Sequence, residues 1–401
     1  MIRLTVFFQF VIAMLLAAPF PSPASEFPPC PVSASLGLSP SPRVMVSSTP
    51  TADEISTLEI GETAPYFSLP GIDGESHSLD HFSGSRILAV IFTCNHCPTA
   101  QAYEGRIIEL VDDYSEKDVS FVAISPNDPE AVRLDELGYT DLSDDFEAMK
   151  IRARDRGFNF PYLYDGETQQ TSRAYGPAAT PHVFIFDGER RLRYSGRIDD
   201  SEKIDRVKQR DVRNALDALL ERKAVPVAET RTFGCSIKWS DKRESARQAL
   251  VRWEKEPVTV SVIDDDGVKA LLANRSADLL LINFWATWCG PCVAEFPELL
   301  TINRMYRNRD FRLITISTDG PGKRDKVLSF LKKQRASFEN HIYHSDDVYG
   351  LIELVDPQWP GAIPYTILIA PGGGIIYRHL GMIDKPLEVK RAIVEHLGRT
   401  Y

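Results

Sequence analysis

The stretch Leu279-Leu-Leu-Ile-Asn-Phe-Trp-Ala-Thr-Trp-Cys-Gly-Pro-Cys-Val-Ala-Glu-Phe-Pro297 decides the fold. Its apolar run from Leu279 to Phe284 has the length and composition of one strand that is buried on both faces. The apolar spacing that follows, through Leu299 and Met305, is typical of a helix. The sequence therefore predicts that a strand delivers the pair Cys289-Gly-Pro-Cys292 to the first turn of a helix.

Two cysteines at the start of a helix have a chemical consequence. The unpaired N–H groups and the positive end of the helix dipole stabilise a thiolate at Cys289. Pro291 suits the first turn because it has no N–H group to leave unsatisfied. The two intervening residues let the sulfurs of Cys289 and Cys292 meet across one turn, so the pair can cycle between dithiol and disulfide.

This motif and its flanking segment, residues 285–288, resemble the active site of thioredoxin. The other interpretations of a C-x-x-C motif are half of a zinc site and a structural disulfide. Zinc normally needs a second cysteine pair or two histidines at a set spacing. No second pair follows at such a spacing, and His341 and His344 lie far downstream. We therefore expect redox chemistry at this motif.

The composition is that of a soluble globular protein. The 401 residues are enough for two domains or three, and 43% apolar and 25% charged residues are ordinary values. The formal charge of −10 arises from 46 basic and 56 acidic residues that are mixed along the chain, which argues against a nucleic-acid partner. We expect no cofactor and no resident metal.

The N-terminus has the pattern of an export signal. Arg3 precedes an apolar run, and small residues suited to signal peptidase follow at Ser22 and Ala24, so residues 1–25 are predicted to be a signal peptide. Residues 26–57 are rich in Pro, Ser and Thr and are predicted to form a disordered leader. Export places the chain in the periplasm or another extracytoplasmic compartment, which is oxidising. The chain would contact a membrane only if the signal segment remained as an anchor.

A second stretch repeats the same logic 195 residues earlier. The apolar run Ile87–Phe92 leads to Cys94-Asn-His-Cys97 and Pro98, and a helical pattern continues through Tyr114. Two copies of one supersecondary unit indicate duplication or fusion of one fold. The predicted class is therefore α/β, with two thioredoxin-like domains in tandem, each a central mixed sheet flanked by helices.

The first half resembles peroxiredoxins of the AhpC/TSA type and related bacterial redoxins. The resemblance lies in the segments GETAPYFSLPGIDGESHSL, FTCNHCP, DDFEAMK, TPHVFIFD and FGCSIKW. It implies a domain over residues 58–222, followed by a linker, residues 223–257, whose Cys235 segment belongs with the first domain. It also implies that Thr180-Pro181 is the cis-proline turn that faces the cysteines in such folds. Without the resemblance, Pro181 is an ordinary proline at the first residue of a strand.

The second half, residues 258–401, resembles the TlpA/ResA-type thioredoxins of cytochrome maturation. The 72 residues between the second cysteine and Pro364 leave room for an extra strand and helix around residues 338–355, as in those proteins. The resemblance implies a cis-proline at Pro364 and gives Glu295 the place of a glutamate that follows the motif. Asn283 stands where thioredoxin has a buried aspartate, so Glu295 is the better candidate for a proton acceptor. The other interpretation of Glu295 is a solvated surface residue.

These features predict a thiol-disulfide oxidoreductase. In each half the first cysteine, Cys289 or Cys94, is expected to attack a protein disulfide, and Cys292 or Cys97 is expected to resolve the mixed disulfide. The expected partners are protein disulfides and dithiols, together with an upstream electron donor of the membrane or thioredoxin type. Gly-Pro is typical of reducing members of the superfamily, whereas His96 resembles the oxidising members. A difference of about 60 mV would favour electron flow from the C-terminal to the N-terminal pair by about 2.8 kcal/mol.

Two other functions stay open for the N-terminal motif. A peroxidase of the peroxiredoxin type presents its cysteine in a Thr-x-x-Cys-Pro setting, which Cys97 fits, but Cys94 stands at the threonine position and favours dithiol exchange. A copper chaperone would bind Cu(I) through Cys94, His96 and Cys97, with His182 as a distant ligand.

Two cysteines lie outside both motifs. Cys235 is either a third redox thiol that approaches Cys97 or a buried bystander, and a bridge between Cys30 and Cys235 has no support from spacing.

Overall fold

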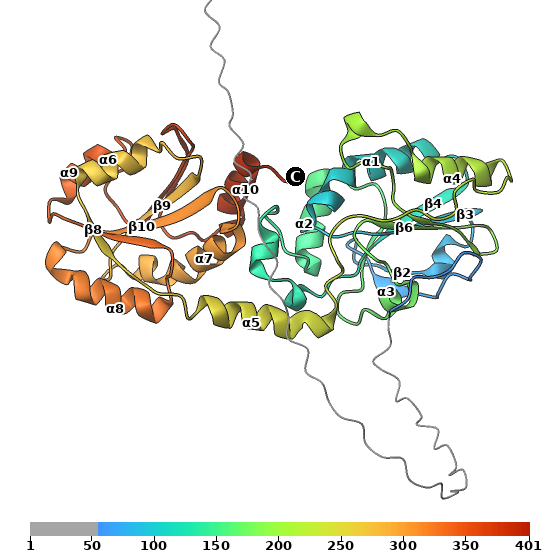
Figure 1. Ribbon diagram of the computed structural model, residues 1–401, viewed down its shortest axis with the longest axis horizontal. Coiled ribbons are helices and arrows are strands. Elements are labelled where there is room, and N and C mark those ends of the chain that lie inside the picture. The colour runs from blue at the N-terminus through green and yellow to red at the C-terminus, as the bar shows by residue number, and fades with distance from the viewer. Residues whose placement is uncertain (1–54) are drawn as a thin grey trace, which may run out of the picture. The chain divides into compact units, whose positions relative to one another are not determined.

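The computed structural model describes residues 55–401, and these residues contain two large sheets of closely related design and one small two-stranded sheet (Figure 1). The predicted signal peptide, most of the predicted leader and Cys30 lie outside the described residues. Within residues 55–401, no helix is both long and apolar enough to cross a membrane.

The N-terminal half builds its sheet from five strands, with a separate two-stranded hairpin before it. In chain order its elements are β1 (Ser68–Pro70), β2 (Ser76–Ser78), β3 (Ile87–Phe92), α1 (Pro98–Tyr114), β4 (Val119–Ser125), α2 (Phe146–Arg156), β5 (Tyr162–Tyr164), α3 (Gln170–Tyr175), β6 (His182–Phe186), β7 (Leu192–Gly196), α4 (Asp211–Leu220) and α5 (Arg243–Trp253).

Strand β3 lies at the centre of this sheet, whose strand order is β5-β4-β3-β6-β7. It pairs parallel with β4 and antiparallel with β6, so that Val90 lies between Val122 and Phe184. Alternate residues of β3 face opposite sides because strand side chains alternate. Ile87, Ala89 and Ile91 pack with α1, α2 and α4, and the residues between them pack with the hairpin and α3. Figure 1 shows α1 and α4 on one side of the sheet and α3 on the other.

The C-terminal half builds a six-stranded sheet. In chain order its elements are β8 (Ser261–Ile263), α6 (Asp265–Ala273), β9 (Leu279–Trp285), α7 (Gly290–Tyr306), β10 (Phe311–Ser317), α8 (Arg324–Gln334), β11 (Glu339–Tyr343), α9 (Val348–Val355), β12 (Tyr365–Ile369), β13 (Ile375–Leu380) and α10 (Pro386–Leu397).

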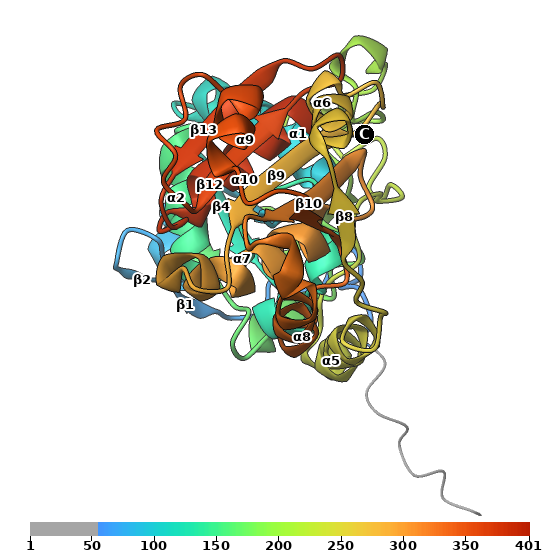
Figure 2. The ribbon, with the colours of Figure 1, turned by 90° about the vertical axis from the view of Figure 1, so that its left-hand side faces the viewer.

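Strand β9 has the central place here, in the order β13-β12-β9-β10-β11-β8. It pairs parallel with β10 and antiparallel with β12, as β3 does with β4 and β6. Leu279 and Leu281 pack with α7, α8 and α10, whereas Leu280, Ile282 and Phe284 pack with α6 and α9. Figure 2 shows this sheet with α7 and α8 on the side away from α6. Burial of each such side chain stabilises the fold by about 1.5–3 kcal/mol.

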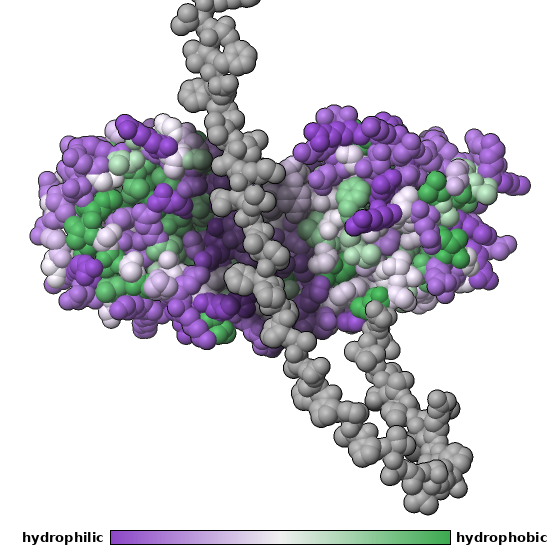
Figure 3. Space-filling model, in the orientation of Figure 1, coloured by the Kyte–Doolittle hydropathy of each residue, from purple (hydrophilic) through white to green (hydrophobic). Residues whose placement is uncertain are grey.

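The predicted fold class is confirmed, because each half is a mixed sheet flanked by helices. The insertion predicted around residues 338–355 is the strand β11 and the helix α9. Within the predicted linker, the helix α5 begins at Arg243, after a tighter turn over residues 240–242. On the face shown in Figure 3, hydrophilic residues predominate and apolar residues lie between them.

Candidate active sites

The C-terminal site lies where β9 gives way to α7. Cys289 is the N-cap of α7, and its sulfur accepts a hydrogen bond from the backbone N–H of Cys292 at 3.2 Å. Pro291 lies in the first turn, and the two cysteines form a disulfide. The Cys289 sulfur also lies 3.6 Å from the carbonyl oxygen of Ile363, the residue before a cis-proline, Pro364. The sulfur thus lies between a helix N-terminus and the cis-proline turn.

Beside this disulfide the surface carries an exposed indole. Trp288 precedes Cys289 and is 68% exposed, whereas Trp285, three residues earlier, is buried against Phe296. Cys289 is 6% exposed and Cys292 is fully buried. Trp288 and the edge of the Cys289 sulfur are therefore accessible from solvent, whereas Cys292 is shielded.

Glu295 lies one turn beyond Cys292 and is buried, so the interpretation as a solvated surface residue was wrong. Its carboxylate accepts hydrogen bonds from Asn283 Nδ2 at 2.8 Å and from the backbone N–H of Ile383 at 3.0 Å. Burial raises the pKa of Glu295 to about 7, and these two hydrogen bonds oppose the rise. A carboxyl group with this pKa can both accept and donate a proton near neutral pH.

The N-terminal motif meets its helix in a different register. Helix α1 begins at Pro98, and its N-cap is Cys97, the second cysteine, whose sulfur accepts a hydrogen bond from Ala100 N–H at 3.4 Å. The same sulfur lies 3.2 Å from the carbonyl oxygen of Thr180, which precedes the cis-proline Pro181. These are the two contacts that Cys289 makes in the other half. Cys97 therefore corresponds to Cys289, and Ala100 stands at the place of Cys292.

The expectation that Cys94 is the attacking cysteine does not fit this geometry. Cys94 lies before the helix and is 3% exposed, with its sulfur 3.2 Å from Thr180 Oγ1. Burial raises the pKa of the Cys94 thiol well above its usual range, and the nearby Cys97 and Asp144 raise it further. The helix start that stabilises a thiolate is occupied by Cys97 instead.

Asp144 fixes the loop between the two cysteines. Its carboxylate accepts hydrogen bonds from the backbone N–H groups of Asn95 and His96, both at 2.9 Å, and from Asn127 Nδ2 at 2.7 Å. It also binds His96 Nδ1 at 2.5 Å. Asp144 was not predicted as a site residue, because 48 residues separate it from His96, although it opens the segment DDFEAMK that carries the family resemblance.

His96 and the neighbouring thiols stabilise a thiolate at Cys97. Burial lowers the pKa of the His96 imidazole, but the Asp144 carboxylate outweighs it and the pKa is raised. Burial by itself would raise the pKa of Cys97. The hydrogen bonds from Cys235 and Cys94 and the positive charge of His96 outweigh burial, so the pKa of Cys97 lies well below its usual range. The buried Nε2 of His96 has no hydrogen-bond partner within residues 55–401.

Cys235 reaches the same sulfur from outside the sheet. Its backbone pairs antiparallel with Thr180, and the Thr180 N–H donates to the Cys235 carbonyl at 3.0 Å. The Cys235 N–H donates to the sulfur of Cys97 at 3.3 Å. Cys235 is partly exposed, whereas Cys94 and Cys97 are buried. The segment around Cys235 therefore belongs with the first domain, and Cys235 approaches Cys97.

The residues of the copper alternative are only partly brought together. His182 makes hydrogen bonds with Ala178 N–H at 3.1 Å and Ser195 Oγ at 3.0 Å, and burial lowers its pKa to about 4. It is therefore a satisfied structural histidine. Ligand atoms of Cys94, His96 and Asp144 do lie within 4.8 Å of one another. The Asp144 carboxylate already accepts four hydrogen bonds, so it serves the loop rather than an ion.

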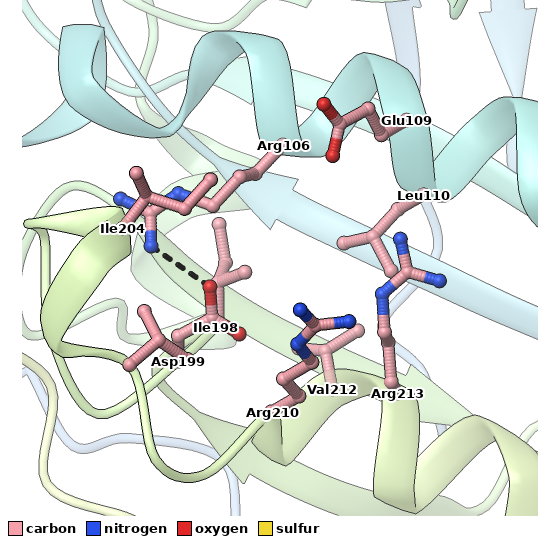
Figure 4. A pocket seen from close by; sticks show the side chains of 10 residues that line it. Arg106, Glu109, Leu110, Ile198, Asp199, Ile204, Arg210, Val212 and Arg213 are labelled. Atoms are coloured by element: carbon pink, nitrogen blue, oxygen red, sulfur yellow. Dashed lines mark hydrogen bonds and ion pairs between the residues drawn. The ribbon is translucent and has the colours of Figure 1, made fainter.

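A hollow on the N-terminal half is lined by arginines rather than by cysteines (Figure 4). Arg106 donates to Asp199 Oδ2 at 2.8 Å and to the carbonyl oxygen of Ser201 at 2.8 Å. Arg210 and Arg213 also point toward the hollow. Arg106 holds the loop after β7 to α1, which is a structural role.

An N-capping cysteine and a facing cis-proline, present twice on closely related sheets, define a thioredoxin-like protein of the redoxin class. The sequence matches the AhpC/TSA family over residues 60–195 and the Redoxin family over residues 255–393. The chain is therefore a tandem protein with an AhpC/TSA-family domain followed by a Redoxin-family domain.

Two similar proteins carry the names of thiol-disulfide exchange proteins. The thiol-disulfide oxidoreductase ResA of Bacillus cereus is 25% identical over 127 residues, which are 32% of this chain and 69% of that protein. The thiol:disulfide interchange protein DsbE homolog of Paracoccus denitrificans is 31% identical over 128 residues, which are 30% of this chain and 61% of that protein. An uncharacterized conserved protein from Geobacillus kaustophilus has a crystal structure with 38% identity, a TM-score of 0.41, and coverage of 45% of this chain and 93% of its own. The names of the Bacillus cereus and Paracoccus denitrificans proteins agree with the predicted oxidoreductase class.

Proposed function

We propose that this protein is an extracytoplasmic thiol-disulfide oxidoreductase that reduces or exchanges protein disulfides at two sites, Cys289–Cys292 and Cys97. The observation that carries the proposal is the pair of equivalent sulfurs, each at a helix N-cap and each next to the carbonyl oxygen before a cis-proline. A helix start stabilises the thiolate that attacks and leaves in disulfide exchange.

At the C-terminal site the reduced protein acts in two steps. The Cys289 thiolate attacks a client disulfide, forms a mixed disulfide and releases one client thiolate. Cys292 then attacks the Cys289 sulfur, which releases the second client sulfur as a thiolate and restores the observed disulfide. Glu295 takes the proton of Cys292, since its pKa of about 7 suits proton transfer and it lies one turn away. An upstream dithiol donor then reduces the pair again.

Electrons flow from the C-terminal to the N-terminal site in this proposal. The reason differs from the sequence argument, because Asn95 and His96 precede the N-capping cysteine instead of following it. What supports the direction is stabilisation of the Cys97 thiolate by His96 and the other thiols. A stabilised reduced form makes a site more oxidising, so it accepts electrons.

The test is a redox titration of the full chain in glutathione buffers, with alkylation and mass mapping of each cysteine. We expect both Cys289 and Cys97 to titrate reversibly, with Cys97 reduced at the higher potential. A lower potential at Cys97 contradicts the relay. If neither site exchanges with glutathione disulfide, the oxidoreductase proposal itself is wrong.

A peroxidase is the second candidate, and the register of α1 favours it. Cys97, with Pro98 directly after it, is the N-capping thiolate, and this is the place of the reactive cysteine in the Thr-x-x-Cys-Pro pattern. The Cys97 thiolate would attack hydrogen peroxide, become a sulfenic acid and release hydroxide, which takes a proton from solvent to give water. A single-turnover assay with a sulfenic-acid trap tests this, and Cys97→Ser should abolish the label. Disulfide exchange without any sulfenic acid rules out the peroxidase.

A further inference from the structure

We infer that Cys235 is the resolving cysteine of the N-terminal site, so that the oxidised form of this site is a Cys97–Cys235 disulfide and not a Cys94–Cys97 disulfide. The inference rests on the proposed exchange chemistry at Cys97. It assigns a catalytic role to a cysteine that lies outside both C-x-x-C motifs.

The register of α1 creates the need for such a residue. In the C-terminal half, the residue three positions after the N-capping cysteine is Cys292, and it closes the disulfide. In the N-terminal half, the residue three positions after Cys97 is Ala100, whose N–H makes the equivalent hydrogen bond but which has no sulfur. A partner for Cys97 must therefore come from another part of the chain.

Cys235 is held in the place of that partner. Its N–H donates to the Cys97 sulfur at 3.3 Å, and its carbonyl oxygen accepts from the Thr180 N–H at 3.0 Å. Its side chain packs against the cluster formed by Cys94, Cys97 and Ala100. Two backbone contacts thus fix the Cα of Cys235 next to the sulfur with which it would bond.

Gly234 permits this close approach. Its φ of +140° lies in a region that side chains rarely adopt, and a Cβ at this position would lie 2.0 Å from the carbonyl oxygen of Thr180. Only glycine lets the chain pass so near the cis-proline turn that the next residue reaches Cys97. The local backbone is therefore built to deliver Cys235.

Cys94 is the competing partner, and its surroundings make it the weaker one. The loop that carries it is fixed by the hydrogen bonds from Asn95 and His96 to Asp144, and Cys94 is buried beneath it. Cys235 is partly exposed, and its neighbour Ser236 is exposed. Cys235 can therefore move toward Cys97 as the client departs, whereas movement of Cys94 would break the Asp144 network.

Reduction of a client disulfide at this site takes two exchange steps. The Cys97 thiolate attacks a disulfide RS–SR′, forms Cys97–S–SR and releases R′S⁻. The Cys235 sulfur attacks the Cys97 sulfur, its proton goes to the departing RS⁻, and RSH leaves. Two electrons pass from Cys97 and Cys235 to the client disulfide. An upstream dithiol then reduces the Cys97–Cys235 disulfide by two further thiol-disulfide exchange steps, which return two electrons and two protons to the pair.

The tryptic map separates the two possible disulfides. Cys94 and Cys97 share one fragment, residues 87–106, whereas Cys235 lies on residues 232–238. The full chain with Cys289→Ser and Cys292→Ser is reduced, oxidised with bis(2-hydroxyethyl) disulfide, quenched with acid and N-ethylmaleimide, and digested. We expect most oxidised protein to hold the two fragments joined. Cys94→Ser should retain the joined fragments, and Cys235→Ser should accumulate the probe on Cys97 at least tenfold.

The outcomes are separable. A predominant internal disulfide within residues 87–106 overturns the inference, and so does a bond from Cys235 to the fragment with Cys30. Rapid release of the probe from Cys97 in the Cys235→Ser variant also overturns it. If Cys97 never takes up the probe in any variant, then exchange at this site, and not only the role of Cys235, is wrong. Circular dichroism confirms that each serine variant folds.

Discussion

The two C-x-x-C motifs of this protein have the same spacing, but a different cysteine of each motif caps the helix that follows. In the C-terminal half the first cysteine, Cys289, caps the helix and the second lies inside it. In the N-terminal half the second cysteine, Cys97, caps the helix and the first lies outside it. The spacing of two cysteines therefore does not decide which sulfur reacts. The position of each sulfur relative to the helix start decides it, because the stabilising N–H groups are there.

The largest effect is expected when Cys97 and Cys94, the two cysteines of the N-terminal motif, are replaced one at a time. In a chain with Cys289→Ser and Cys292→Ser, we expect Cys97→Ser to slow reaction with Ellman's reagent at pH 6 by at least about a hundredfold, since only the thiolate reacts and the ionised fraction of a thiol at pH 6 falls as its pKa rises. Cys94→Ser, the matched control, should stay within a few-fold of the parent. Stopped-flow absorbance measures both rates, and the reverse order would restore Cys94 as the attacking cysteine.

Glu295 allows a test of the C-terminal site through stability. Its folded pKa of about 7 lies above its usual value of 4.5, so the folded protein prefers the protonated form. Stability is therefore lost as pH rises from about 4.5 to about 7, because unfolding then lets the carboxyl ionise in water. We expect Glu295→Gln to be stabilising at pH 8, relative to its effect at pH 4, by up to about 3 kcal/mol.

Urea unfolding at the two pH values measures this difference for Glu295→Gln. Glu353→Gln, an exposed glutamate on α9, is the control and should show no pH-dependent gain. An equal gain for both variants at pH 8 would show a general effect of net charge instead of the buried carboxyl.

A substitution at Asp144 tests what stabilises the Cys97 thiolate. Asp144→Asn removes the carboxylate that raises the pKa of His96, and with it the positive charge that lowers the pKa of Cys97. The pH at which alkylation of Cys97 reaches half of its maximal rate should therefore move upward, by about one pH unit for each unit of rise in the Cys97 pKa. The rate is measured with iodoacetamide over pH 4 to 9. Asp145→Asn is the control, because asparagine also caps a helix and Asp145 caps α2. An equal shift in both variants would implicate the α2 start instead.

The smallest expected effect concerns Gly234. Gly234→Ala should destabilise the docked segment by about 1–3 kcal/mol, because its backbone is strained for alanine and the Cβ meets Thr180. The yield of joined Cys97 and Cys235 fragments should fall with it. Gly105→Ala, in the open on α1, should raise stability by about 0.5–1 kcal/mol and leave that yield unchanged. Matching yields in the two variants would mean that the glycine does not position Cys235.

Much of the fold follows from local sequence. The runs at Ile87–Phe92 and Leu279–Phe284 are apolar at nearly every position, and only a central strand is buried on both faces. The helix α2 also carries local signals for its two ends, because Asp145 caps its start and Gly157 ends it. Such signals act over a few residues, so a single sequence carries them.

The N-terminal site was harder to predict because its decisive contacts are long-range. Asp144 lies 48 residues from His96, and Cys235 lies 138 residues from Cys97. The register of α1 was misjudged for a local reason: Cys94 and Cys97 copy the spacing of Cys289 and Cys292. The proline gave a usable signal, because proline favours the first helical position and Pro98 directly follows Cys97.

The bridge between Thr180 and Cys235 also bears on how the other half meets its clients. In the N-terminal half the backbone before the cis-proline is already paired with the chain's own Cys235, through an isolated antiparallel bridge. Within residues 55–401, the N–H of Ile363, the residue in the same place at the C-terminal site, makes no backbone hydrogen bond. An extended peptide can add to such a free edge through main-chain hydrogen bonds. The pairing of Cys235 with Thr180 is thus an internal example of the backbone pairing that a client peptide could make with Ile363 in the C-terminal half.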